Sequence, residues 1–276
     1  MTNDLIKARD AFSAANLETR HMVNARDWGV LQVGNSGPAL VLLPGTLGRG
    51  DIFWNQIIDL RNHARILSLT YPQSGSIQDW AGDISTLMAT HEFENGVILG
   101  SSLGGYVAQY FAATYPDQTK ALIAANTLHS VAMLSELPPY NADLDAVPAD
   151  TLMQGFLGGL TQWAAEEPAR TDLVDLLIAE VSGRIPVPEL RSRLKALKNG
   201  PELPLIALKK QQIFTVDSGD DRLIPPPVRA AVRARLDPFR AAHFKTGSHF
   251  PYLTHPADYS AMIANILGVK INGDHE

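Results

Sequence analysis

The sequence predicts an α/β protein with a mostly parallel central sheet, helices on both faces of that sheet, and a helical insertion. Two observations carry this prediction. Short apolar runs alternate with helical patterns in the first half of the chain and again near its C-terminus, which is typical of parallel strands joined by crossover helices. Between about residues 130 and 205 the strand-like runs vanish, prolines punctuate the sequence, and helical spacing dominates.

The elements of the first half follow from local patterns. Leu5–Ala15 has the spacing of a short amphipathic helix. Two apolar runs, Trp28–Val33 and Ala39–Leu43, are separated by the turn-forming segment Gly34–Pro38, which predicts two strands joined by a tight connection. The same criteria predict helices at Ile52–Leu60, Asp79–Thr90 and Gly104–Tyr115, and strands at Arg65–Leu69, Gly96–Gly100 and Ala121–Ala125.

The insertion carries an apolar stripe at helical spacing, and the strand–helix alternation resumes after it. We therefore expect one domain over residues 1–276, with a helical cap inserted at residues 130–205. The stripe consists of Leu152, Phe156, Leu160 and Trp163. The elements after the insertion are strands at Gln212–Val216 and Phe239–Phe244 and helices at Pro226–Leu236 and Pro256–Leu267.

Composition excludes several functional classes. The chain of 276 residues has no cysteine, which rules out disulfides, a thiolate nucleophile and metal sites built on sulfur. A net charge of −6 argues against nucleic-acid binding and against docking on an anionic membrane. The N-terminus lacks the apolar region of a secretory signal, and runs such as Ala39–Leu43 are too short to span a membrane, so we expect a cytoplasmic protein.

The stretch Val97–Tyr106 carries the clearest chemical signal, because it contains a G-x-S-x-G pattern centred on Ser102. A nucleophile at a sharp strand-to-helix turn needs very small residues two positions before and after it, here Gly100 and Gly104. The preceding run is strand-like and the following one helical, as this role requires. The alternative is a plain glycine-rich turn of a nucleotide-binding fold, but neither phosphate-loop pattern is present here. Ser101 is not centred between the glycines.

A serine nucleophile needs a base, and the base needs an orienting acid, in the chain order Ser, Asp or Glu, His. The acid-rich loop after the strand at Gln212–Val216 offers Asp220 and Asp221, which could instead serve a solvated turn. His249 lies in a loop after the last predicted strand, beside a glycine. It suits the role of base better than His243 or His255, which lie within a strand and near a helix start.

Stabilising an oxyanion takes two backbone donors. The first is expected to be the N–H of Leu103, the residue after the nucleophile. The second is expected from the loop Pro44–Gly48, which follows an early strand, with Thr46 as the preferred donor and Leu47 as the alternative.

Taken together, these segments resemble the α/β-hydrolase superfamily over nearly the whole chain, and more narrowly the maspardin family. The resemblance rests on Leu43–Thr46 with Phe53-Trp54, on Tyr71-Pro72, on the turn Gly100–Gly105, and above all on the closing run Arg240–Leu253. It implies the α/β-hydrolase fold. It also favours Asp221 over Asp220, since hydrolases of this fold commonly place the acid four residues before the proline of an Asp-x-x-Ile/Val-Pro run.

The resemblance also has two points of departure. Many relatives carry His-Gly where this chain has Pro44-Gly45, so a side chain that often braces the loop is missing. Some maspardin-type proteins keep the serine but lack the acid or the histidine, and the family is associated with protein binding as much as with catalysis. Because Asp221 and His249 are both present here, the sequence favours a working enzyme.

The expected function is hydrolysis of a small, mostly uncharged carboxylic ester through Ser102, His249 and Asp221, with no metal or organic cofactor. The cap would shape the substrate pocket, and its stripe either lines that pocket or packs the cap onto the core. The alternatives are a non-catalytic binding or adaptor protein of the same fold and a hydrolase of carbon–carbon bonds. The sequence makes no prediction about homo-oligomers.

Overall fold

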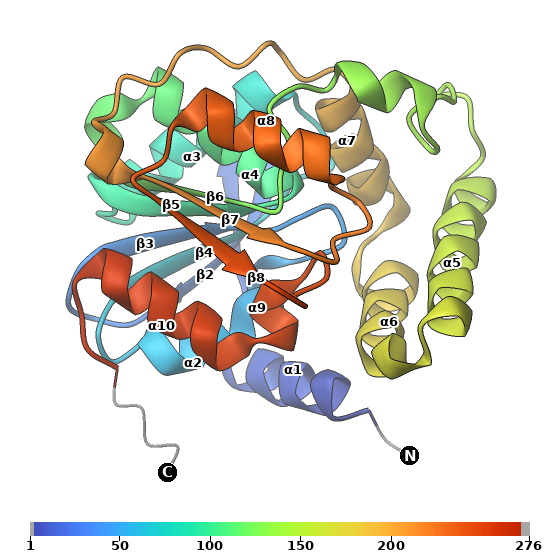
Figure 1. Cartoon of the computed structure of the whole chain (residues 1–276), viewed down its shortest axis with the longest axis horizontal. Helices are drawn as coiled ribbons and strands as arrows, with labels where there is room; N and C mark the ends of the chain where they lie inside the picture. The colour runs from blue at the N-terminus through green and yellow to red at the C-terminus, as the bar shows by residue number, and fades with distance from the viewer. Residues whose placement is uncertain (1–2, 272–276) are drawn as a thin grey trace.

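The computed structural model describes residues 3–271 and contains a central sheet of eight strands (Figure 1). Its order is β1-β2-β4-β3-β5-β6-β7-β8. Strand β2 runs antiparallel to β1 and β4, and all other neighbours are parallel, so the predicted mostly parallel sheet is confirmed. The strands are β1 Thr19–Val23, β2 Arg26–Val33, β3 Ala39–Leu43, β4 Arg65–Thr70, β5 Gly96–Ser101, β6 Thr119–Ala125, β7 Ile213–Ser218 and β8 Arg240–Phe244.

Helices cover both faces of the sheet. One face packs against α3, α4 and α8, and the other against α1, α2 and α10 (Figure 1). The apolar face of α3, formed by Trp80, Ile84, Leu87 and Met88, is buried against the sheet. These helices are α1 Asp4–Ala15, α2 Trp54–Leu60, α3 Ile77–Thr90, α4 Leu103–Thr114, α8 Pro226–Leu236, α9 Pro251–Thr254 and α10 Pro256–Leu267, with short 3-10 turns at η1 Gly50–Phe53, η2 Pro116–Gln118 and η6 Lys210–Gln212.

The N-terminal strands follow the sequence prediction, with one strand that it missed. The tight connection between β2 and β3 is present as predicted, with Gly34 and Gly37 at φ of 84° and 89°, and β4 lies between the two strands in the sheet. Strand β3 is buried along its whole length, so it occupies an interior place that a two-strand unit could not provide. The prediction missed β1, a mostly exposed edge strand whose polar residues give no apolar run.

Residues 130–205, which we call the cap, lie between β6 and β7, two strands that are neighbours in the sheet. The regular elements of the cap are all helical, and it has a small apolar cluster of its own, formed around Leu152, Leu190 and Leu194. It lies to one side of the sheet in Figure 1. Its helices are α5 Ala149–Glu166, α6 Thr171–Ala179 and α7 Val187–Lys198, with short turns at η3 Ala132–Glu136 and η4 Pro168–Arg170 and a π-helical turn, η5, at Glu180–Arg184.

Within residues 3–271, none of the helices combines the length and the apolar character needed to cross a bilayer. The cytoplasmic location and the division into domain and cap stay predictions.

Candidate active site

Ser102 occupies the turn between β5 and α4 in a conformation that few residues adopt. Its φ and ψ are 54° and −117°, a strained region for a residue with a side chain. The flanking glycines explain how the turn can close. A Cβ at Gly100 would lie 2.0 Å from the Gly104 carbonyl oxygen, and one at Gly104 would lie 2.1 Å from the Leu43 carbonyl oxygen. The turn therefore has the shape that the G-x-S-x-G pattern predicts.

The backbone around Ser102 is fixed by its neighbours in the sheet. Its N–H donates to the Ala125 carbonyl at 2.9 Å, and its own carbonyl accepts from Thr127 Oγ1 at 2.7 Å. Helix α4 begins at Leu103, and the first N–H groups of a helix have no partner within it. The Leu103 N–H thus lies directly after the serine at the positive end of a helix.

Asp221 and His249 form a buried pair. His249 Nδ1 lies 3.0 Å and 2.9 Å from the two carboxylate oxygens of Asp221. The exposed fraction is only 3% for His249 and 6% for Asp221. An ionised carboxylate can only accept hydrogen bonds, so Nδ1 carries the proton and Nε2 keeps its lone pair free. This is the tautomer that a general base needs.

The environment of Asp221 favours its ionised form. Burial by itself would raise the pKa of this carboxyl, but His249, the Asn126 amide and the Ile224 N–H together hold its pKa below the ordinary value. The donors are close: Asn126 Nδ2 at 2.9 Å, the Leu223 N–H at 2.9 Å and the Ile224 N–H at 3.0 Å. The carboxylate is therefore both charged and fixed in orientation.

The other candidates for acid and base have different partners. Asp220 accepts from Arg170 at 2.8 Å and from the Ser248 N–H at 2.7 Å. His243 is bonded to Asp217 at 2.6 Å, outside the buried pair. His255 Nδ1 lies 3.0 Å from Thr254 Oγ1. Only Asp221, of the two acids left open by the local pattern, is bonded to His249.

Consecutive residues at the end of β6 connect the pair to the serine. Asn126 bonds the Asp221 carboxylate, while Thr127 bonds the Ser102 carbonyl. The two predicted centres are thus held by adjacent residues of one strand end. Among the hydrogen bonds of residues 3–271, none joins the Ser102 hydroxyl to His249. Such contacts are often loose in unliganded enzymes and tighten when substrate binds.

The loop Pro44–Gly48 passes directly beside Ser102. A Cβ at Gly45 would lie 3.2 Å from Ser102 Cβ and 3.9 Å from its hydroxyl oxygen. The loop closes on itself through a hydrogen bond of 3.1 Å from the Gly48 N–H to the Gly45 carbonyl. Thr46, the preferred second backbone donor to an oxyanion, lies within this turn, next to Leu47.

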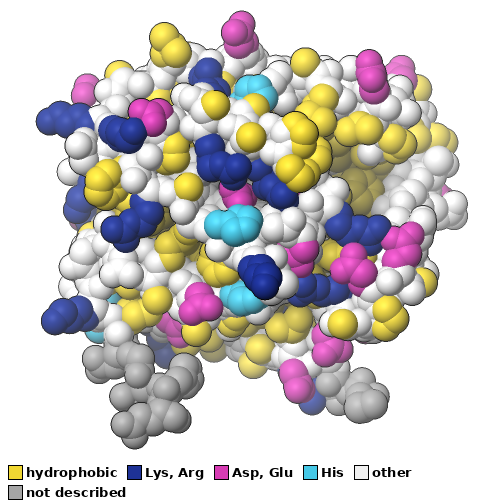
Figure 2. Space-filling view, in the orientation of Figure 1, with side chains coloured by type: hydrophobic (Ala, Val, Ile, Leu, Met, Phe, Trp, Pro, Cys, Tyr) yellow, Lys and Arg dark blue, Asp and Glu magenta, His cyan; other side chains and the backbone are white. Residues whose placement is uncertain are grey.

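A cavity of about 690 Å³ lies between the cap and the loop that carries His249. Trp163 of the predicted stripe stacks on Phe250 with ring centroids 6.4 Å apart, and Phe250 meets the His249 ring edge-on at 5.0 Å. Figure 2 shows a hollow walled by hydrophobic side chains on this face. The cavity walls include Leu47, His249 and Phe250 from the core and all four residues of the stripe: Leu152, Phe156, Leu160 and Trp163.

Comparison with known proteins identifies the family. The family model described as the alpha/beta hydrolase family matches residues 40–262. The chain belongs to the alpha/beta hydrolase family. Among curated relatives, it is similar to maspardin of Danio rerio, with 23% identity over 88% of this chain and 80% of the relative.

Two further matches extend the comparison of this alpha/beta hydrolase. A pimeloyl-[acyl-carrier protein] methyl ester esterase of Yersinia pseudotuberculosis is 24% identical over 82% of this chain and 92% of the relative. The crystal structure of a hydrolase from Pseudomonas aeruginosa matches with a TM-score of 0.74 and 19% identity, covering 92% of this chain and all of that one. The structural match confirms the predicted fold.

Sequence reasoning missed two polar residues of this alpha/beta hydrolase site. Asn126 follows β6 at φ 44°, and its signal was a polar residue at the carboxyl end of a buried parallel strand, where ligand and catalytic groups gather. Arg193 is a fully buried residue of α7 that binds the loop beside Ser102. Nothing in the local sequence distinguishes it from the other basic residues of that helix.

Proposed function

We propose that the protein is a serine hydrolase that acts on small, mostly uncharged carboxylic esters through Ser102, His249 and Asp221. The observation that carries the proposal is the buried Asp221–His249 pair, held by the strand end that also holds the strained Ser102 turn. The likeness to a methyl ester esterase supports ester chemistry.

In the proposed mechanism, His249 Nε2 takes the hydroxyl proton as Ser102 Oγ bonds to the ester carbonyl carbon. The tetrahedral intermediate collapses with cleavage of the carbon–oxygen bond to the alcohol, and His249 donates its proton to that leaving oxygen. Water then attacks the acyl-enzyme, again losing a proton to His249, and Ser102 recovers its proton as the carboxylic acid departs. Asp221 stabilises the imidazolium that forms in each half-reaction.

Two backbone groups would bind the negative charge on the carbonyl oxygen. We assign these roles to the N–H groups of Leu103 and Thr46, with Leu47 as the alternative to Thr46. Loss of one such donor costs about 3–4 kcal/mol of barrier in serine hydrolases.

The cavity beneath the cap supports the choice of an uncharged substrate. Its walls are mainly apolar and include His249, the proposed base, and Leu47, the alternative oxyanion donor. An apolar acyl or alcohol group would be desolvated there without leaving a charge unpaired.

The test is labelling with a fluorophosphonate, which reacts with an activated serine. We expect one label per wild-type chain and none in Ser102→Ala, because the alanine variant lacks the attacking oxygen. Ser101→Ala is the matched control and should keep the label. Ser101 is the last residue of β5 and directly precedes the proposed nucleophile. Hydrolysis of short aryl esters should follow the same pattern.

The similarity to maspardin favours one alternative, a non-catalytic binding protein that presents the cap to a partner. Folded wild-type protein that takes no label and cleaves no activated ester would support that alternative. Cleavage of vinylogous diketo acids in preference to aryl esters would instead indicate carbon–carbon bond hydrolysis.

A further inference from the structure

We propose that Arg193, on cap helix α7, is a positioning residue for the oxyanion hole, because it binds two of the carbonyls of the loop Pro44–Gly48. This inference rests on the proposed hydrolase function. It gives the cap a part in the chemistry in addition to enclosing the substrate.

Arg193 contacts the loop Pro44–Gly48 directly. Arg193 is fully buried, and its Nη1 donates to the Thr46 carbonyl at 2.9 Å and to the Gly48 carbonyl at 2.8 Å. The hydroxyl of Tyr71 donates to the Pro44 carbonyl at 3.1 Å, and the Gly48 N–H donates to the Gly45 carbonyl. One partner therefore holds each of the carbonyls at positions 44, 45, 46 and 48.

Holding a carbonyl also aims the next N–H. A peptide unit is planar and trans, so its C=O and the following N–H point in opposite directions. The bond to the Thr46 carbonyl therefore sets the direction of the Leu47 N–H, and the Gly45 bond does the same for the Thr46 N–H. Arg193 thus fixes directly the plane that carries the Leu47 N–H. It also holds Gly48 by its carbonyl, and the Gly48 N–H in turn holds the plane that carries the Thr46 N–H, so both candidate donors depend on Arg193.

The burial of this guanidinium needs an explanation, because a buried charge costs several kcal/mol unless it is well paired. Its ion pair with Glu189, one helical turn earlier, is only moderate at 3.3 Å, and Arg193 Nε has no partner in the described chain. Its Cζ lies 5.6 Å from the Tyr71 ring centroid. Burial lowers the pKa of Arg193 to about 10, which still leaves the side chain charged at neutral pH. The loop carbonyls are thus its best partners.

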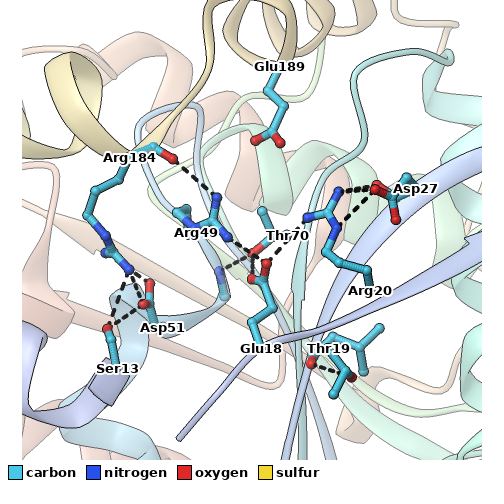
Figure 3. Close-up of polar contacts among 12 residues, drawn as sticks. Ser13, Glu18, Thr19, Arg20, Asp27, Arg49, Asp51, Thr70, Arg184 and Glu189 are labelled. Atoms are coloured by element: carbon cyan, nitrogen blue, oxygen red, sulfur yellow. Dashed lines mark hydrogen bonds and ion pairs between the residues drawn. The ribbon is translucent and has the colours of Figure 1, made fainter.

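Charged side chains also tie the segment after this loop to the cap (Figure 3). Arg49 Nη1 donates to the Arg184 carbonyl at 3.1 Å, and Arg49 Nη2 lies 2.5 Å from Glu18. Arg184 pairs with Asp51, which also accepts from Ser13 Oγ at 2.6 Å. The cap therefore contacts the core both before and after Gly48 in the sequence. These contacts of Arg49 and Arg184 keep the cap attached even where Arg193 is replaced.

Arg191 provides a matched control, because it lies on the same helix and also binds carbonyls, those of Leu144 and Val147 within the cap. We would compare Arg193→Met, Arg193→Lys and Arg191→Met in full-length protein. The assays are kcat and KM for an aryl ester, the inhibition constant of an aryl trifluoromethyl ketone, and the melting temperature. The ketone forms a hemiketal with the serine, so its affinity depends on the oxyanion hole.

We expect Arg193→Met to lower kcat by about 10- to 100-fold, less than the loss of a whole oxyanion donor. KM should change little, and ketone affinity should fall by the same factor as kcat/KM. Arg193→Lys keeps the positive charge but lacks the two-pronged guanidinium. Its kcat and ketone affinity should lie between those of wild type and Arg193→Met. Arg191→Met should keep kcat within about twofold, since it touches no part of the loop. A kcat that is unchanged in Arg193→Met, or lowered equally in both methionine variants, would overturn the proposal.

Two further outcomes are also decisive. If Arg193→Met fails to fold, Arg193→Lys decides the question: a folded lysine variant with wild-type kcat and ketone affinity would contradict the inference. If wild-type protein takes no fluorophosphonate and cleaves no ester, the proposed function itself fails. Hydrogen exchange at residues 45–48 then tests the brace alone, with faster exchange in Arg193→Lys in favour and equal exchange against.

Discussion

Residues 3–271 contain two aspartate–histidine pairs at the same end of the sheet, and their surroundings differ. In one pair, His249 Nδ1 lies 3.0 Å and 2.9 Å from the Asp221 oxygens; in the other, His243 Nδ1 lies 2.6 Å from Asp217. Both aspartates come from β7 or the loop after it. By hydrogen bonding alone, either pair could orient an imidazole.

Solvent exposure and neighbouring charges distinguish the two aspartate–histidine pairs. The side chain of His243 is 58% exposed, whereas that of His249 is 4% exposed. Asp217 also forms an ion pair with Arg233, while the remaining partners of Asp221 are neutral donors. His249 borders the cavity beneath the cap, beside the loop that reaches Ser102. Burial, neutral donors and a neighbouring serine thus distinguish the proposed catalytic pair more than the Asp–His bond itself does.

Replacing each histidine in turn should separate the two pairs most clearly. His249→Gln should lower kcat by about a million-fold, because the proposed general base is lost. His243→Gln should leave kcat within about twofold, since its exposed ring touches neither the cavity nor Ser102. Steady-state kinetics with an aryl ester measures both. Equal losses in the two variants, or none in His249→Gln, would refute the assignment.

Replacing the aspartates should give a smaller difference in rate and an additional signal in stability. Asp221→Asn should lower kcat by about 1,000- to 10,000-fold, because the wrong tautomer is then favoured, whereas Asp217→Asn should have little effect. The pKa of Asp221 is lowered in the folded protein, so its carboxylate stabilises the fold above the unfolded pKa of about 4.

That stabilisation is lost as pH falls through the lowered pKa. The difference in free energy of unfolding between wild type and Asp221→Asn should therefore be constant near pH 7 and shrink below about pH 4. Urea unfolding at several pH values measures it. A difference that stays constant down to pH 3 would argue that the carboxylate is not preferentially ionised in the folded state.

The smallest expected effect concerns the cavity that borders only one of the pairs. Gly159 of α5 lines it, whereas Gly158, next in the helix, does not, and a Cβ at either meets nothing within 4 Å. Gly159→Leu should therefore lower the ratio of kcat/KM for octanoate over acetate aryl esters by about 10-fold. Gly158→Leu should leave this ratio unchanged. A shift in both variants would indicate an effect on the helix as a whole.

Local patterns were enough to predict much of the fold. The helices at Pro226–Leu236 and Pro256–Leu267 begin and end as predicted, because proline marks each start and the apolar spacing continues to the end. Spatial order was harder to predict. The position of β4 between β2 and β3 depends on burial across the sheet, and β1 is recognisable only once β2 offers it an edge.

The residues of the candidate site also divide into those that local patterns indicate and those that only the folded chain reveals. Ser102 could be proposed from the sequence because its neighbouring glycines record a steric demand. Chain order and loop position favoured His249, and the resemblance to α/β hydrolases favoured Asp221 over Asp220. Arg193 and Asn126 could not be proposed in this way, because their roles arise from contacts between residues far apart in the chain. Arg193 reaches carbonyls about 145 residues away. Sequence patterns report local geometry, whereas such braces appear only when the chain has folded.

The cap leaves and re-enters the sheet at neighbouring strands, β6 and β7, an arrangement that invites the grafting of foreign lids onto the scaffold. The contact of Arg193 sets a condition on such chimeras. A transplanted lid would have to supply a cation at the same place, or the recipient turn would need an internal support such as a histidine. Lid and turn should therefore be exchanged as one module.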